Sequence, residues 1–221
     1  MPIGVFLVMH LTTNFMIRFN DAEHDHFQEK VNLIHSLGPL LVPVEIFGII
    51  LPIAFHAGLG IKIWLQSRSN TSAYRYGGNI RYTLQRVTGM IALVFIAYHL
   101  WHMHWLGAQF GGAKFDPEDA SASAARALQD APFWVPVLYN VGIVAAAYHF
   151  ANGIWTSLIT WGITVGKNAQ KQAGYVCAVL GIALACIGLA AMDGFREYPV
   201  EQHEDGLNNV AVQPTDDQVD G

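Results

Sequence analysis

Histidines within apolar sequence are the residues of this chain best suited to chemistry. They occur as His10 in FLVMHLTTN, His56 in IAFHAGLG, His99 in VFIAYHLWHMHWLG and His149 in AAYHFANGIW. A histidine in hydrocarbon costs free energy unless something satisfies its ring nitrogens. A single one would more often be a satisfied core residue, but one deep histidine in each of four helices requires a common cause.

Bis-histidine haem is the simplest common cause of this pattern. Neutral imidazole is a good axial ligand for haem iron, and a low-spin b haem takes two such ligands from facing helices of a bundle. Four histidines would therefore hold two haems. The sequence contains no C-x-x-C-H motif, so the expected haems are not covalently attached.

Long uncharged stretches provide the helices that would carry these histidines. Charged residues make up 13% of the chain, yet none occurs in residues 2–17, 46–61, 87–113, 131–166 or 172–192. A spanning helix needs roughly 20 mostly apolar residues, and strict alternation typical of a membrane barrel is missing. The sequence predicts an all-α membrane protein with five transmembrane helices, of which helices 1–4 form a haem-binding four-helix bundle.

The domain organisation is correspondingly simple. We expect one transmembrane domain over residues 1–197 and an acidic, disordered tail over residues 198–221, which is polar and low in aromatic residues. The first uncharged stretch begins at the second residue and has no positive flank. This favours a start inside a longer natural helix, and the alternative is a short first helix with a free amino terminus.

The depth of each histidine predicts how the four would pair. His10 and His99 lie eight or nine residues before the outer ends of helices 1 and 3, so at ~1.5 Å per residue they are level with each other. His56 lies about nine residues before the inner end of helix 2. His149 is nearer the middle of helix 4 and joins His56 partly by elimination. We expect an outer haem on His10 and His99 and an inner haem on His56 and His149.

Two further histidines follow His99 in the same stretch. His102 lies one turn further out, and His104 lies beside Trp105 at the expected edge of the membrane. Tryptophans at that depth are typical of an aromatic belt. We expect both histidines at the membrane interface, with contact to a haem propionate or a quinone as the alternative.

The loops predict the orientation of the helices. The loop between helices 2 and 3 and the loop between helices 4 and 5 contain lysines and arginines but no acid, whereas the other side receives nearly every carboxylate. Positively charged loops stay in the cytoplasm. We therefore expect a multi-pass protein of the cytoplasmic membrane, with the N-terminus inside and the C-terminus outside. The net charge of -5 belongs to the outer face and gives no indication of nucleic-acid binding.

A few polar residues within the apolar stretches are further candidates. Glu45 is the only carboxylate in the apolar part of helix 2, and it is either a quinone or proton group or a hydrated interfacial residue. Gln85, Arg86 and Thr88 lie at the inner start of helix 3. They either contact a propionate of the inner haem or anchor the helix among the lipid headgroups.

Several stretches resemble a known family, the cytochrome b558 membrane anchors of succinate dehydrogenase and fumarate reductase of the single-polypeptide, five-helix, di-haem type. They are GVFLVMHLTTN, ILPIAFHAGLGIKIW, RYTLQRVTGMIALVFIAYHLW and YHFANGIWTSLITWGIT, and the likeness extends over about residues 3–190. Two features depart from the family: a basic N-terminal stretch with an Arg-x-His-Ser element is missing, and the acidic tail is longer.

The resemblance implies a cofactor set and a set of partners. In that family the four helix histidines ligate two b haems, helix 1 with helix 3 and helix 2 with helix 4. A flavoprotein with FAD and an iron–sulfur subunit dock on the cytoplasmic face, where the 66–86 loop would meet them. Electrons from succinate pass through the partners, the inner haem and the outer haem to a quinone, expected to be menaquinone. The chain alone would not act on succinate.

Two other functions remain open from the sequence. One is a di-haem quinone-linked anchor of another respiratory complex, such as a nitrate reductase or formate dehydrogenase. The other is a haem-free membrane scaffold or transporter whose histidines pack or relay protons, and it predicts no Soret absorbance. The direction of reaction, succinate oxidation or fumarate reduction, does not follow from an anchor sequence.

Overall fold

The computed structural model describes residues 2–66 and 76–200, and these residues form helices and no strands. The α-helices are α1 (Pro2–Phe15), α2 (His26–His35), α3 (Leu41–Glu45), α4 (Leu51–Gln66), α5 (Gly77–Met103), α6 (Ala120–Gln129), α7 (Trp134–Thr160) and α8 (Lys167–Glu197). Short 3-10 helices are η1 (Met16–Phe19), η2 (Gly38–Leu40), η4 (Trp105–Phe110) and η5 (Pro117–Asp119), and η3 (Ile46–Ile50) is a π-helix.

Four helical segments within the described residues are long and apolar enough to cross a membrane, namely Gly38–Gln66, Gly77–Met103, Trp134–Thr160 and Lys167–Glu197. The apolar helix Ile3–Phe19 is shorter. A helix of 27 residues is about 40 Å long at ~1.5 Å per residue, which exceeds the ~30 Å hydrocarbon layer. The chain is thus an all-helical, multi-pass membrane protein.

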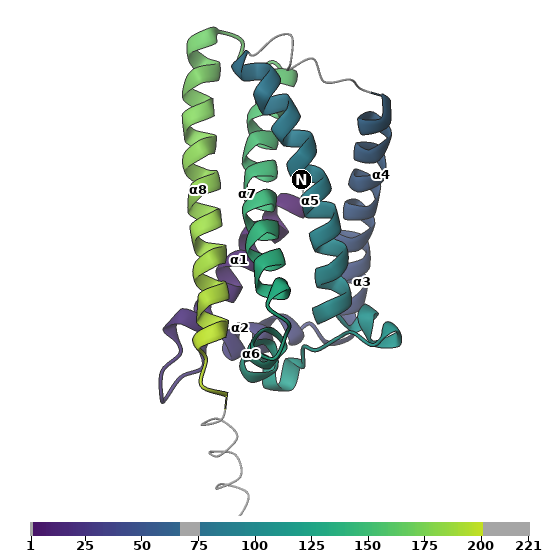
Figure 1. Cartoon of the computed structure of the whole chain (residues 1–221), viewed down its shortest axis with the longest axis vertical. Helices are drawn as coiled ribbons and strands as arrows, with labels where there is room; N and C mark the ends of the chain where they lie inside the picture. Colours follow the sequence, from purple (N-terminus) through teal and green to yellow (C-terminus); the bar gives the residue numbers. More distant parts are fainter. Residues whose placement is uncertain (1, 67–75, 201–221) are drawn as a thin grey trace, which may run out of the picture.

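The α7 helix lies between α5 and α8, and α1 crosses against α8 (Figure 1). Glycines at intervals of seven residues allow α8 to approach its neighbours closely. A Cβ on Gly181 would lie 2.9 Å from the Cβ of Ala151, and one on Gly188 would lie 2.6 Å from Ile143 Cγ2. The sequence predicted a haem-binding bundle of helices 1–4, and α8 adds tight packing against α7 and α1.

The segment from Gly38 to Gln66 packs loosely in comparison. The structure describes this whole segment, and none of the residues in its most apolar stretch is buried. The segment changes from a 3-10 helix through α3 to the π-helix η3 before α4 begins. Pro52 has no backbone N–H to donate, so one hydrogen bond of a regular α-helix is missing here. The wider π-helical turn just before Pro52 accommodates this gap.

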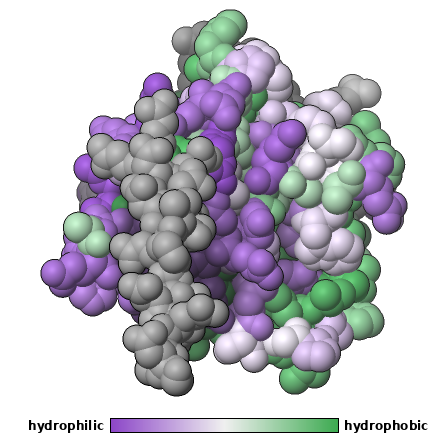
Figure 2. Space-filling view, turned by 90° about the horizontal axis from the view of Figure 1, so that it is seen from below, coloured by the Kyte–Doolittle hydropathy of each residue, from purple (hydrophilic) through white to green (hydrophobic). Residues whose placement is uncertain are grey.

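Two short helices, α2 and α6, close the lower end of the bundle (Figure 1). Hydrophilic residues gather on this end face, and hydrophobic residues lie toward parts of its edge (Figure 2). The small side chains of α6 let it sink between its neighbours, and Ala120, Ala122 and Ala125 are fully buried. The ring of Phe27 in α2 packs edge-on against Phe195 near the end of α8, with centroids 5.0 Å apart.

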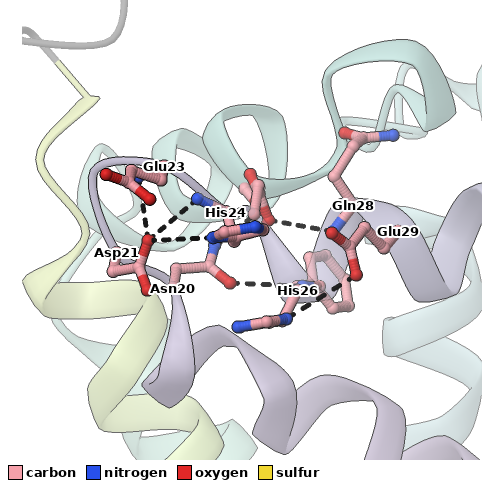
Figure 3. Close-up of polar contacts among 10 residues, drawn as sticks. Asn20, Asp21, Glu23, His24, His26, Gln28 and Glu29 are labelled. Carbon is pink, nitrogen blue, oxygen red and sulfur yellow. Dashed lines mark hydrogen bonds and ion pairs between the residues drawn. The ribbon is translucent and has the colours of Figure 1, made fainter.

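A hydrogen-bonded turn holds α2 in this position (Figure 3). Asp25 caps α2, because its Oδ1 accepts from the backbone N–H of Gln28 at 2.9 Å. The same oxygen accepts from Asn20 at 2.6 Å and from Ser121 of α6 at 2.8 Å. The side chain of Gln28 donates to the Pro117 carbonyl at 2.8 Å. One carboxylate therefore ties the end of η1 to both α2 and α6.

Some expectations lie outside the described residues. They are the part of the tail expected to be disordered (residues 198–221) that follows residue 200, and the part of the 66–86 loop that contains Arg68 and Arg75.

Candidate functional site

The His10 and His99 side chains meet between α1 and α5. Their ring centroids are 5.7 Å apart, and their planes make an angle of 71°. The rings are therefore not stacked face to face. Phe6 stacks on His10 with centroids 5.3 Å apart, and the Asn14 amide donates to the His10 carbonyl at 2.7 Å.

The His56 and His149 side chains meet in the same way between α4 and α7. Their ring centroids are 5.9 Å apart at an interplanar angle of 76°. His56 is exposed, whereas His149 is half-buried. Gly89 of α5 contacts the His149 ring and lies ten residues before His99 on that helix. The two pairs are thus separated by about 15 Å along the bundle.

The spacing within each pair fits a metal held between two imidazoles. A nitrogen–metal bond of about 2 Å on each side places the two ring centroids about 6 Å apart. Both pairs lie close to that value before any metal is present. The described residues contain no group of three or more His, Cys, Asp or Glu side chains arranged around a metal ion. Two ligands suffice for haem iron because the macrocycle supplies the others.

The contacts of His149 select its tautomer. Its Nδ1 lies 3.0 Å from the backbone carbonyl of Gln85. A carbonyl only accepts, so Nδ1 carries the hydrogen and the lone pair of Nε2 is free for a metal. Metal-binding histidines are commonly oriented by such a contact. A Cβ on Gly89 would lie 2.8 Å from His149 Cε1. The His149 ring therefore occupies the space that the side chain of any residue other than glycine would fill at position 89.

Gln85, expected near a propionate, bridges α5 and α7 instead. Its side-chain amide donates to the His149 carbonyl at 3.0 Å, and its Oε1 accepts from Asn152 at 2.8 Å. This reciprocal pair fixes the register of the two helices at the level of the His149 ring. Gln85 therefore positions His149 through the backbone, and its contact with a propionate stays a prediction.

Arg86 and Thr88 contact other groups. The Arg86 guanidinium donates to the Trp64 carbonyl at 2.7 Å and lies over the rings of Trp64 and Tyr82. It thereby fastens the end of α4 to α5. Thr88 donates to the Leu84 carbonyl within its own helix at 2.7 Å. Haem contacts for both residues stay predictions.

A tyrosine that the sequence did not single out connects two histidines of α5. The Tyr139 hydroxyl of α7 lies 3.3 Å from His99 Nδ1 and 2.9 Å from His102 Nδ1. Tyr139 is buried, and His102 is only 6% exposed. His102 is therefore buried in the protein, where α7 provides a polar partner for its ring, and its place at the depth of the membrane interface stays a prediction.

The Glu45 carboxylate ends α3 next to the π-helix. Its Oε2 accepts from the Trp105 indole at 3.0 Å and lies 3.6 Å from His104 Nε2. The side chains of Glu45 and His104 are each 21% exposed. Burial lowers the pKa of His104, and Glu45 acts in the opposite direction by favouring the charged ring. Glu45 thus belongs to a small polar cluster at the lower end of the bundle.

Sequence reasoning missed Tyr139, Gly89 and Asn152. A glycine inside an apolar helix signals a close approach, but only the fold identifies the His149 ring as its neighbour. Tyr139 and Asn152 carry no local signal, because their partners lie on another helix.

Comparisons with known proteins identify a family for the chain. Residues 67–190 match the family described as succinate dehydrogenase/fumarate reductase transmembrane subunit. The succinate dehydrogenase cytochrome b558 subunit of Bacillus subtilis (strain 168) is 34% identical over 195 residues, which cover 88% of this chain and 90% of that protein.

Proposed function

The chain belongs to the succinate dehydrogenase/fumarate reductase transmembrane subunit family, and we propose that it is a di-haem b anchor that passes electrons between an iron–sulfur subunit and membrane quinone. The observation that carries this proposal is the presence of two histidine pairs, 5.7 Å and 5.9 Å between centroids, at two levels of one bundle. A haem-free scaffold would have no need for this matched spacing.

Each pair would hold one b haem. His10 and His99 would be the axial ligands of one, and His56 and His149 those of the other. When bound, haem iron supplies one-electron transfer. The loose packing of the Gly38–Gln66 segment supports this assignment, because a flat macrocycle between α4 and its neighbours would cover apolar side chains that are now exposed.

The chain's own residues would orient the ligands. The Gln85 carbonyl accepts the Nδ1 hydrogen of His149. The Tyr139 hydroxyl, 3.3 Å from His99 Nδ1, would accept the Nδ1 hydrogen of His99 in the tautomer that leaves Nε2 for a metal. Gly89 provides the room for the His149 ring. These groups would fix the orientation of both imidazoles.

Charge supports an orientation for the five proposed spans, α1 with η1 as the first. Arg81, Arg86, Lys167 and Lys171 lie at the upper end in Figure 1, where α5 and α8 begin. The carboxylates of the α2 turn and η5 lie at the opposite end. Positively charged ends face the cytoplasm, so the FAD-containing and iron–sulfur partners would dock at the upper end, with the C-terminus outside.

The polar cluster of Glu45, His104 and Trp105 supports a quinone or proton site at the outer end. A carboxylate beside a histidine can exchange protons when a quinone is reduced or a quinol is oxidised. The indole N–H holds the carboxylate in place. The site lies on the side of the proposed outer haem, and menaquinone is the expected quinone.

Single substitutions test the ligand assignment. His99→Ala and His56→Ala should each lower the haem content of the purified chain from two to one per chain. His102→Ala is the matched control, because it removes a buried histidine of the same helix as His99 and should leave two haems. An unchanged haem content in His99→Ala, or the loss of one haem in His102→Ala, would contradict the proposal.

A further inference from the structure

A pocket at the upper end of the bundle is separate from both histidine pairs. It has a volume of about 320 Å³ and lies where α5, α7 and α8 meet. Arg81, Lys167 and Lys171 supply three positive charges to its lining, and Trp155 and Tyr175 supply aromatic rings. The proposed electron transfer does not use this pocket.

Arg81 is the cation of this pocket that packing holds in place. The Arg81 guanidinium lies over the Trp155 ring at 4.2 Å. Trp155 is itself fixed, because its indole donates to the Gln170 carbonyl at 2.8 Å. A Cβ on Gly174 would lie 3.5 Å from the Arg81 guanidinium nitrogens, so α8 closes over the arginine.

Nothing acidic is available to balance these cations within the described part of the chain. The sequence has no carboxylate between Glu45 and Asp116 or between Asp130 and Asp193. The ion pairs among the described residues do not involve Arg81, Lys167 or Lys171. Three clustered cations in a partly closed site repel one another, and an anion bound among them would relieve this repulsion.

An apolar face leads away from the pocket along α8. Tyr175, Val179 and Ile182 are spaced at i, i+4 and i+7 on this helix and are 61%, 68% and 65% exposed. Lys167 and Lys171 precede them on the same face, because they lie eight and four residues before Tyr175. The surface thus joins a cationic pocket to an apolar track that runs toward the centre of the membrane.

We propose that this pocket binds the phosphate headgroup of an anionic phospholipid, whose acyl chains lie along the Tyr175, Val179 and Ile182 face of α8. Lipid has both halves of the required chemistry, an anion and a long apolar chain, whereas free phosphate or an acidic protein segment has only the first. Basic pockets between membrane helices on the cytoplasmic side are typical of such headgroup sites. The proposal rests on the proposed orientation of the helices, and it does not depend on the haems.

Native mass spectrometry of the full-length chain, delipidated in mild detergent, tests the site. Phosphatidylglycerol and phosphatidylcholine with the same acyl chains are titrated separately. The wild type should bind phosphatidylglycerol in preference to phosphatidylcholine. Lys167→Gln/Lys171→Gln should bind phosphatidylglycerol about 25-fold more weakly, from about 1 kcal/mol per lysine at about 1.4 kcal/mol per tenfold. Both lysines are exposed, so the variant should fold.

The matched control is Lys30→Gln/Lys62→Gln, which removes the same charge outside the pocket. Equal phosphatidylglycerol binding by all three proteins would overturn the proposal, because the lipid would then bind elsewhere. Displacement of the lipid by equimolar inorganic phosphate would reassign the pocket to a free anion. The pocket variant is also purified as the assembled complex, and loss of the iron–sulfur partner there, with lipid binding unchanged, would reassign the pocket to protein docking. A further variant, Val179→Asn, should weaken lipid binding while inorganic phosphate binding stays the same.

Discussion

Substitution of Gly89 by alanine is the sharpest structural perturbation of one proposed haem site. The added Cβ would lie 2.8 Å from His149 Cε1 and 3.1 Å from Nδ1, whereas carbon atoms in contact prefer about 3.5–4.0 Å. The ring must therefore retreat by about 0.7 Å. Metal–ligand distances tolerate only about 0.2 Å, so the ring can no longer bind iron at its ordinary distance.

The size of the effect follows from overpacking. A methyl group forced into a filled site costs about 1–3 kcal/mol, which corresponds to roughly 5- to 150-fold weaker haem binding. We expect Gly89→Ala to lower the occupancy of the His56–His149 site and to leave the His10–His99 site full. The effect on folding should be smaller, because alanine is favoured over glycine within a helix by up to about 1 kcal/mol.

Pyridine haemochrome quantification and a redox titration of the purified chain measure this result. The variant should lose the component with one midpoint potential and retain the other. Gly78→Ala is the matched control, because it lies in the same helix and its Cβ would meet nothing within 4 Å. Two haems with unchanged potentials in Gly89→Ala would refute the placement of His149 as an iron ligand.

Three other substitutions test separate parts of the account. Tyr139→Phe removes the proposed acceptor for the His99 Nδ1 hydrogen and should raise the midpoint potential of the outer haem, measured by redox titration, by up to about 60 mV. The control Tyr148→Phe, in the same helix, should leave both midpoint potentials unchanged. Glu45→Gln should slow quinone turnover on the order of 100-fold with haem content intact, and unchanged turnover would remove Glu45 from the site. Asp25→Ala removes three hydrogen bonds of the α2 turn and should lower the free energy of unfolding, measured by thermal melting, by about 1–3 kcal/mol. A change of less than about 0.5 kcal/mol, which is typical of an ordinary surface substitution, would contradict the role given to the turn.

The absence of charge located the long helices well, because a charged side chain in hydrocarbon is costly wherever it lies. The uncharged stretch 46–61 stops at Lys62, whereas the sequence placed the inner end of this helix about nine residues after His56, and the helix ends at Gln66. A lysine near a helix end can extend its amine toward the headgroups, so charge alone does not end a spanning helix.

The parts of the fold that depend on contacts between helices could not be predicted. The α6 helix, ASASAARALQ, was not among the five predicted helices, and the small size of its side chains allows it to be buried between its neighbours. The burial of His102 depends on Tyr139, which comes from another helix. Depth along each helix, with elimination for His149, predicted the same two pairs of histidines whose rings lie together in the fold.

The haem content of the purified full-length chain is the most direct test of the central claim. A dithionite-reduced minus oxidised spectrum shows the type of haem, and pyridine haemochrome gives the number per chain. The two histidine pairs predict a b-type spectrum and two haems per chain. A chain without Soret absorbance would contradict it. A chain with a single haem, lost only when one of the two histidine pairs is substituted, would contradict it as well.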